Sequence, residues 1–263
     1  MTIALGMMTG NSVILAADCQ ESDGYFKDFA LKISSSMTHT RINATVRSAL
    51  AITGAGPGIY LDAISDEITD LFHARQERDI GAFENVLKDK VETFYKKHVV
   101  ELAPHVDREF RVIIGAQIEG ITGLWVSDAT VVKRIMAVEA VGTGAPFAKM
   151  ALSTRYAMAD TNMSIVLAIL AVHNAREYDH YCGKGTAVVC LHNDLAYNIS
   201  PGLVVAAEKL LDKYLGIEYS SFHYALCGNV VSGEQRTERI VKRLNDLRGE
   251  FTELAGQFLA DPP

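Results

Sequence analysis

The sequence has few cysteines, and their spacing suits neither a disulfide framework nor a zinc site. The four cysteines are Cys19, Cys182, Cys190 and Cys227. They form no Cys-x-x-Cys pair, and the eight histidines are scattered without a metal-ligand pattern. A disulfide framework is also not indicated for a chain of 263 residues. We therefore predict free thiols in a reducing cytoplasm, no metal and no cofactor.

Long hydrophobic runs and a targeting segment are also missing. The longest apolar run, from Ile165 to Val172, is far too short to span a bilayer. The N-terminus lacks the basic region, apolar core and cleavage site of a signal peptide. We therefore expect a cytoplasmic protein that does not bind a membrane.

Clustered positive charge and phosphate-binding loops are absent as well. The formal net charge is −7, and mixed runs such as Lys88-Asp89-Lys90 are typical of solvated helix faces. Phosphate binding needs clustered Lys and Arg, so nucleic acid is disfavoured as a partner. The glycine-rich stretch 54–58 is followed by Ile59, where a dinucleotide-binding loop needs its third glycine.

The rest of the composition and the hydrophobic pattern indicate a globular α+β protein. Apolar residues make up 49% of the chain and charged residues 22%. Apolar runs predict strands at 2–8, 12–18, 31–36, 43–47, 49–54, 109–118, 121–127, 130–138 and 186–192. Helical spacing predicts a helix through Tyr60, Ile64, Ile68 and Leu71, and helices at 81–102, 145–157, 163–177, 201–215 and 233–259.

The order of these elements predicts the fold. Strands, two helices, strands, two helices and a strand pack most economically as a four-layer α/β/β/α sandwich of two antiparallel sheets. Residues 1–192 are predicted to form this domain, and residues 193–263 a C-terminal helical extension. The last helix carries an apolar seam: Ile240, Leu244, Leu247, Phe251, Leu254 and Phe258. The seam fits packing on the chain's own domain, or alternatively an interface between subunits.

The first two strands are predicted to form a hairpin. We interpret Thr9-Gly10-Asn11 as a three-residue loop with a central glycine. If Met8 pairs with Ser12, Thr2 lies opposite Asp18 and both side chains are on one face of the sheet. This placement depends on the register, because a slip of one residue would destroy it.

Five segments, in order and with matching spacing, resemble a mature proteasome β-subunit over about residues 2–192. They are Thr2-Ile3 with 13–18, Ala30-Leu31-Lys32-Ile33, Ile52-Thr53-Gly54-Ala55-Gly56, Val141-Gly142-Thr143-Gly144, and 178–183. The chain is therefore similar to proteasome-type N-terminal-nucleophile threonine hydrolases, and the resemblance implies the four-layer sandwich. Cys182 and Thr143 stand where the family usually has serine, and Ile3 stands where a second threonine is frequent.

The resemblance also implies a catalytic set. Thr2 would be the nucleophile once Met1 is removed, with its own α-amine as the base. The positive charge of Lys32 would lower the pKa of the hydroxyl and amine, Asp18 would orient Lys32, and the N–H of Gly54 would stabilise the oxyanion. Thr143, Asp179 and Cys182 would support the Thr2 amine and a nearby water.

The implied substrate is a peptide or a protein. By resemblance, Ala30, Ser34, Ile52 and Gly56 would line the first specificity pocket, and because all four are uncharged we expect a neutral or apolar preference. The resemblance further implies a homo-oligomer, with a ring and an ATPase regulator as further expectations. Two alternatives stay open: a transpeptidase or ligase, in which an amine captures the acyl-enzyme, and a non-catalytic scaffold subunit with the same sandwich.

Overall fold

The computed structural model describes residues 2–23, 26–39, 47–74, 79–100, 110–153, 160–227 and 233–260. The chain forms two compact units, one up to Ile199 and the other from Ser200 to Asp261. The sequence pattern placed the boundary earlier, after residue 192. The strand Leu195–Asn198 accounts for the difference, because it pairs with the preceding strand and so belongs to the first unit.

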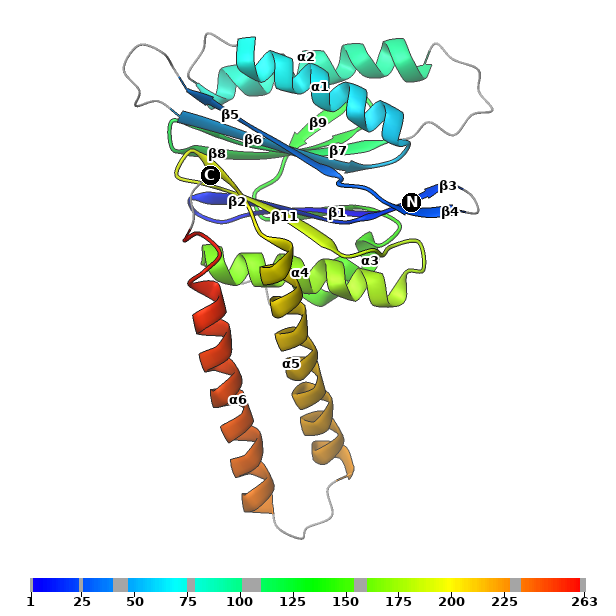
Figure 1. Cartoon of the computed structure of the whole chain (residues 1–263). Helices are drawn as coiled ribbons and strands as arrows, with labels where there is room; N and C mark the ends of the chain where they lie inside the picture. Colours follow the sequence, from blue (N-terminus) through cyan, green and yellow to red (C-terminus); the bar gives the residue numbers. More distant parts are fainter. Residues whose placement is uncertain are drawn as a thin grey trace. The chain divides into compact units, whose positions relative to one another are not determined.

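The first unit contains two antiparallel sheets that face each other (Figure 1). One sheet has the order β10-β1-β2-β11-β12, with β1 (Ile3–Met8), β2 (Ser12–Asp18), β10 (Val138–Gly142), β11 (Thr186–His192) and β12 (Leu195–Asn198). The other has the order β5-β6-β7-β8-β9, with β5 (Ile33–His39), β6 (Arg47–Ala55), β7 (Arg111–Ile118), β8 (Ile121–Asp128) and β9 (Val131–Arg134).

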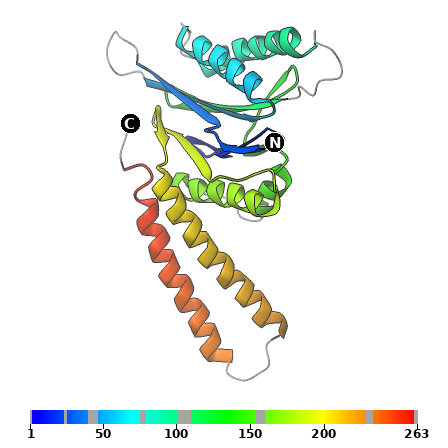
Figure 2. The ribbon, with the colours of Figure 1, turned by 45° about the vertical axis from the view of Figure 1, so that its right-hand side comes forward.

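Helices cover the outer face of each sheet, as Figures 1 and 2 show. α1 (Gly58–Ala74) and α2 (Ile80–Tyr95) lie on the sheet that contains β6, and α3 (Ala145–Leu152) and α4 (Thr161–Tyr178) lie on the sheet that contains β1. Successive side chains of β6 point to opposite faces of the sheet and so contribute to two hydrophobic cores. Ala49 and Ala51 pack between the sheets, whereas Leu50 and Ile52 pack under the helices. The predicted four-layer α/β/β/α sandwich is therefore confirmed.

The register of the first hairpin differs from the predicted one. Met8 pairs with Val13, and the N–H of Thr9 donates to the carbonyl of Ser12 at 2.9 Å. The loop therefore has two residues, Gly10 and Asn11, and the predicted pairing of Met8 with Ser12 is wrong by one position. The loop is one residue shorter than predicted because Thr9 continues the strand pairing through its hydrogen bond to Ser12. Loop length sets the register of a hairpin, so the whole pairing shifts by one residue.

Several other elements differ from their predicted limits. The predicted strand 130–138 is two strands, β9 and β10, in different sheets. The structure also has a two-stranded ribbon, β3 (Gln20–Asp23) with β4 (Phe26–Phe29), that was not predicted. The end of the predicted helix 81–102 is a π-helical segment, Lys96–Val100. Residues 43–46 of a predicted strand lie outside the described residues.

The second unit is built from two long helices, α5 (Pro201–Cys227) and α6 (Gly233–Ala255). They pack against each other, and Lys213 forms an ion pair with Glu250 at 2.6 Å. On the predicted apolar seam Leu247 is buried, whereas Leu244 is 40% exposed. Among the helices of the described residues, none is both long and apolar enough to cross a membrane.

Candidate active site

Three side chains from three separate segments meet at one end of the first sheet. Thr2 directly precedes β1, Asp18 is the last residue of β2, and Lys32 directly precedes β5. The hydroxyl of Thr2 donates to Oδ1 of Asp18. Nζ of Lys32 donates to Oγ1 of Thr2 at 2.5 Å and to Oδ1 of Asp18 at 2.9 Å. The hydroxyl oxygen is therefore held between a carboxylate and an ammonium group.

The carboxylate of Asp18 is fully buried and well satisfied. Besides the hydroxyl of Thr2 and the ammonium of Lys32, it accepts from the backbone N–H of Ile3 at 3.1 Å, Gln20 at 3.2 Å and Gly183 at 3.1 Å. Burying a charge is costly unless it is paired and hydrogen-bonded, and here both conditions are met. These bonds fix Asp18 in one position and order the chain around Thr2.

The contact between Thr2 and Asp18 does not arise from the predicted register. In the observed register Ala4 pairs with Ala17, so the strand pairing does not place Thr2 opposite Asp18. Thr2 lies just before β1 and is not bound by the alternation of the strand, which leaves its side chain able to turn toward the carboxylate.

Lys32 is held in place by the second sheet. Its carbonyl accepts a hydrogen bond from the hydroxyl of Thr53 at 2.9 Å, and Thr53 pairs with Ile33 in the β5–β6 ladder. The Lys32 side chain is 13% exposed. The ammonium therefore comes from the opposite sheet and bridges the two layers at the site.

The end of β6, just before the turn at residues 56–57, lies beside Thr2. A Cβ on Gly54 would lie 2.5 Å from the carbonyl oxygen of Arg111, so no side chain fits there. A Cβ on Gly142 would lie 2.0 Å from the carbonyl oxygen of Thr2 and 3.2 Å from Cβ of Ala55. Gly142 also has φ +97°, which favours glycine. Close backbone approach thus brings the end of β6, β10 and Thr2 together.

The remaining predicted catalytic residues form a connected group on the other side of Thr2. The N–H of Gly144 donates to the carbonyl of Thr2 at 3.4 Å, and a Cβ on Gly144 would lie 2.9 Å from Sγ of Cys182. Sγ of Cys182 contacts Oδ2 of Asp179 at 3.5 Å, and Thr143 is also hydrogen-bonded to Asp179. The structure therefore brings Thr143, Asp179 and Cys182 together around the backbone of Thr2.

The pKa of the Asp179 carboxyl group and the pKa of the Cys182 thiol are shifted in opposite directions. Burial disfavours the carboxylate of Asp179, but hydrogen bonds from Thr143, Tyr181 and Cys182 outweigh it and lower its pKa. Burial, with the negative charges of Asp18 and Asp179, raises the pKa of the Cys182 thiol to about 12. Cys182 is therefore a neutral thiol at ordinary pH and has no thiolate character.

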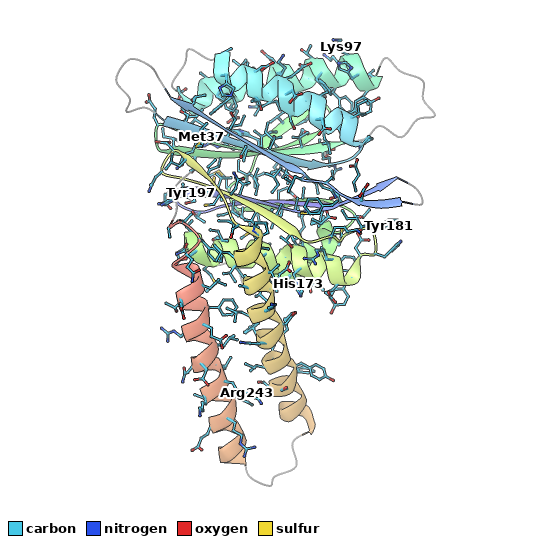
Figure 3. All side chains as sticks on the ribbon, viewed as in Figure 1. Met37, Lys97, His173, Tyr181, Tyr197 and Arg243 are labelled. Carbon is cyan, nitrogen blue, oxygen red and sulfur yellow. The ribbon has the colours of Figure 1, made fainter. Side chains whose placement is uncertain are left out.

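Gln20 is a site residue that the sequence reasoning missed. Its side chain is 4% exposed, and its Nε2 donates to the carbonyl of Tyr181 at 3.0 Å (Tyr181 is labelled in Figure 3). Its backbone N–H donates to Asp18. Gln20 thus joins the carboxylate of Asp18 to the segment that carries Asp179 and Cys182. No pattern in the sequence marks it, because it lies on the unpredicted strand β3.

The four predicted substrate-binding residues differ in exposure. Ser34 is exposed and pairs with Ile52, so the two side chains share one face of the β5–β6 pair. Ile52 is only 1% exposed and belongs to the core under α1 and α2. The N–H of Ala30 donates to the carbonyl of Cys19, and Gly56 has φ +135°.

The two facing sheets with helices on their outer faces form an α/β/β/α sandwich, and Thr2, Asp18 and Lys32 meet at one end of it. The sequence matches no protein-family model and no curated protein. Solved structures of Anbu are similar in fold to this chain. They include a Gly-1 mutant of Anbu from Hyphomicrobium sp. strain MC1, with TM-score 0.67 and 13% identity over 84% of this chain and 97% of that chain.

Two further Anbu structures give the same result. Anbu from Yersinia bercovieri, described as an ancestral β-subunit, matches with TM-score 0.67 and 11% identity over 83% of this chain and 96% of that chain. The helical assembly of the Anbu complex from Pseudomonas aeruginosa matches with TM-score 0.66, at the same identity and coverage. Because 83% of 263 residues exceeds the first unit, each match extends past residue 199. At these identities the likeness shows the fold.

Proposed function

We propose that this chain is a threonine hydrolase that cleaves peptide bonds with the hydroxyl of Thr2 as the nucleophile. The observation that carries the proposal is the position of Oγ1 of Thr2, which contacts both the carboxylate of Asp18 and the ammonium of Lys32. A threonine hydroxyl needs a base and a stabilising positive charge to attack a carbonyl. Asp18 fixes the hydroxyl, and Lys32 stabilises the negative charge that develops on Oγ1.

In the first half of the reaction, Oγ1 forms a bond to the carbonyl carbon of the substrate. The hydroxyl proton passes to the α-amine of Thr2, directly or through a water. The N–H of Gly54, near the end of β6, is the proposed donor to the oxyanion. The tetrahedral intermediate collapses, the C–N bond breaks, and the leaving amine takes the proton from the α-ammonium. An ester between Thr2 and the acyl part of the substrate remains.

In the second half, a water attacks the ester. The α-amine takes a proton from the water, the bond between Oγ1 and the acyl carbon breaks, and the proton returns to Oγ1. Asp179, Thr143 and Cys182 lie around the Thr2 backbone and are proposed to orient the amine and this water. The carboxyl product leaves, and the starting site is restored.

The amine can act as this base only if Thr2 is the first residue of the mature protein. Methionine aminopeptidases accept a small following residue, so removal of Met1 would expose the amine. An unperturbed α-amino group titrates at about pH 7.7–8.0, which suits a base near neutral pH. Processing of the N-terminus is therefore part of the proposal.

The direct test is turnover of peptides. Purified protein is incubated with a mixture of unstructured peptides, and products are identified by mass spectrometry beside the Thr2→Ala variant. We expect new carboxyl termini with the wild-type protein and none with the variant. Equal product formation by both proteins, or none by either, would refute the hydrolase proposal; the second outcome would favour a scaffold subunit.

Adding a competing amine separates hydrolysis from transpeptidation. With glycine amide in excess, a hydrolase still gives mainly free carboxylates, whereas a transpeptidase gives mainly amides with a different mass. We expect free carboxylates to predominate. Amide products in the majority would replace the peptidase assignment with an acyl transferase that uses the same nucleophile.

We further propose that the protein assembles into a homo-oligomer. The support is the fold likeness to Anbu, for which one solved structure is described as a helical assembly. Native mass spectrometry at several concentrations tests this, and a monomer throughout would contradict it. The ring and the ATPase regulator implied by resemblance stay predictions.

A further inference from the structure

The ribbon β3–β4 presents its two faces to different parts of the candidate site. Successive side chains of a strand point to opposite faces. Gln20 points toward the segment 181–183, where its Oε1 lies 2.5 Å from the position of a Cβ on Gly183. Glu21 therefore points the other way, toward the glycine turn and the start of α1. The ribbon follows Asp18 directly, so both side chains are anchored close to the catalytic carboxylate.

The carboxylate of Glu21 lies against the far end of the turn that links β6 to α1. A Cβ on Gly58, the first residue of α1, would lie 3.0 Å from Oε1 of Glu21. The near end of the turn, Ala55, lies beside Thr2 at Gly142. Three residues of chain extend to at most about 11 Å, so the carboxylate is within reach of a long side chain on a substrate residue bound at Thr2.

No side chain of the described residues pairs with this carboxylate, and the N-terminus of α1 offers it only a partial positive charge. The side chain of Glu21 is exposed and forms neither an ion pair nor a hydrogen bond with another of the described residues. It is not a side-chain cap of α1, since Tyr60 and Leu61 donate to the carbonyl of Pro57 instead. Its acceptor oxygens are therefore available to a ligand.

A second carboxylate stands beside it. Glu21 pairs with Asp28 in the β3–β4 register, so both side chains project from the same face of the ribbon. Asp28 is also exposed and forms no ion pair among the described residues. Like charges directly opposite each other destabilise a strand pair. The pair therefore makes a local negative surface at the rim of the turn, at a cost that a cationic ligand would relieve.

We infer that Glu21, reinforced by Asp28, selects substrates that carry lysine or arginine at the residue whose carbonyl Thr2 attacks. The inference rests on the proposed hydrolase function and names its substrate class. It replaces the neutral preference expected from Ala30, Ser34, Ile52 and Gly56, because β3 and its side chains were not part of that set. The ammonium or guanidinium group of the substrate would bind on the side of the Glu21 carboxylate that faces away from α1, because the partial positive charge of a helix N-terminus disfavours a cation.

The test compares two fluorogenic peptides that differ only at this residue, with arginine or leucine. We expect kcat/KM to be higher for the arginine peptide. Glu21→Gln should lower the arginine-to-leucine ratio by about tenfold, since a substrate charge partly desolvated against one carboxylate loses its partner. Glu21→Lys should reverse the charge preference, so that a peptide with glutamate is cleaved faster than the arginine peptide.

The matched control is Asp70→Asn, which removes the same charge from the exposed side of α1 about 18 Å further along the helix. It should leave the ratio unchanged. Labelling of Thr2 by a β-lactone monitors the nucleophile in each variant independently of the peptide. Normal labelling with no arginine preference, or with a ratio unaffected by Glu21→Gln and Glu21→Lys, would overturn the inference alone. Loss of both labelling and turnover in the wild-type protein would overturn the proposed function.

Discussion

The two ends of strand β2 each hold a hydroxyl next to a nitrogen group, yet the two clusters differ in kind. At one end, Oγ1 of Thr2 contacts the charged pair of Asp18 and Lys32. At the other end, Oγ of Ser12 lies 2.7 Å from Nδ1 of His192 and 2.9 Å from Oγ1 of Thr161. Both hydroxyls are buried, at 4% and 0% exposure respectively.

A hydroxyl beside a nitrogen group is not by itself an activated nucleophile, because it also needs a base and stabilisation of the charge that develops on it. The Ser12 hydroxyl contacts the side chains of Asn11, Thr161 and His192, which satisfies buried polar groups and joins β2, β11 and α4. The Thr2 hydroxyl instead lies beside an ammonium that can stabilise an alkoxide, and next to a backbone nitrogen that processing can free. We therefore expect the Ser12 end to serve stability and the Thr2 end to serve chemistry.

The largest effect is expected at Thr2 itself. Thr2→Ala removes the nucleophilic oxygen, so peptide turnover and β-lactone labelling should fall by at least about 10³-fold. The control Thr9→Ala removes a hydroxyl from the loop end of the same hairpin and should leave both unchanged. Turnover by Thr2→Ala at a wild-type rate would show that the chemistry lies elsewhere.

Lys32 should give the next largest effect, and it should act on both activity and stability. Lys32→Met leaves the buried carboxylate of Asp18 without its counter-charge, so the free energy of unfolding should fall by about 3 kcal/mol. Labelling of Thr2 should slow by about 10²-fold or more, because charge on Oγ1 is no longer stabilised. Urea unfolding and labelling rates measure the two effects.

The control for this variant is Lys133→Met, which removes an exposed lysine from β9. It should change the free energy of unfolding by no more than a few tenths of a kcal/mol and leave the rate of Thr2 labelling unchanged. If Lys32→Met labelled as fast as the control, the ammonium would have no part in the reaction, whatever its distance from Thr2.

Ser12→Ala should separate the two ends of β2. The substitution leaves His192 and Thr161 short of a buried partner, so the free energy of unfolding should fall by about 1–2 kcal/mol. Labelling of Thr2 should stay within about twofold of wild type, because the charged cluster is untouched. A loss of labelling comparable to that of Lys32→Met would mean that the two clusters act as one unit.

Cys182→Ser should have the smallest effect on activity and a distinct effect on the pH dependence of stability. A hydroxyl replaces a thiol of similar size and is the better donor, so labelling should not fall by more than about threefold. The pKa of the thiol is raised from 9.0 to about 12 in the folded protein, so the folded state holds its proton more tightly than the unfolded state. The contribution of this thiol to the free energy of unfolding is therefore fully present below about pH 9 and is lost as the pH rises toward 12.

Urea unfolding at about pH 8 and about pH 10.5 checks this sign. Wild-type protein should lose stability between the two values, and Cys182→Ser should lose less. Some decline should remain in the variant, because burial raises the pKa of Cys190 to about 12 as well. A variant with the same decline as wild type would show that the Cys182 proton does not contribute.

Much of the fold followed from periodicity, whereas details of pairing did not. Strands such as β2 and β7 and the helix α4 are marked by long apolar patterns, so their type and approximate position were predictable. The short ribbon β3–β4 was not, because Gln20–Asp23 is polar and carries no alternation. The hairpin register was missed by one residue, since Thr9-Gly10-Asn11 suits a loop of either two or three residues.

The candidate site shows the same division. The resemblance of short segments to proteasome β-subunits predicted Thr2, Asp18 and Lys32 as site residues, and in the structure these three side chains are in contact. The hairpin pattern put Thr2 opposite Asp18 with a register that was wrong by one residue, and it gave no sign of Lys32, which lies just before a strand. The positions of the Gln20 and Glu21 side chains depend on the orientation of the short β3–β4 ribbon. That orientation is fixed only by the tertiary structure.

The measurement that tests the central claim most directly is the intact mass of the purified protein before and after reaction with a peptide epoxyketone. Such a reagent offers two electrophilic carbons, so it reports a reactive hydroxyl and a free amine on the same residue. We predict a starting mass without Met1 and one added equivalent, mapped by fragmentation to Thr2 and absent from Thr2→Ala. A protein that begins at Met1 and gains no mass would contradict Thr2 as the nucleophile.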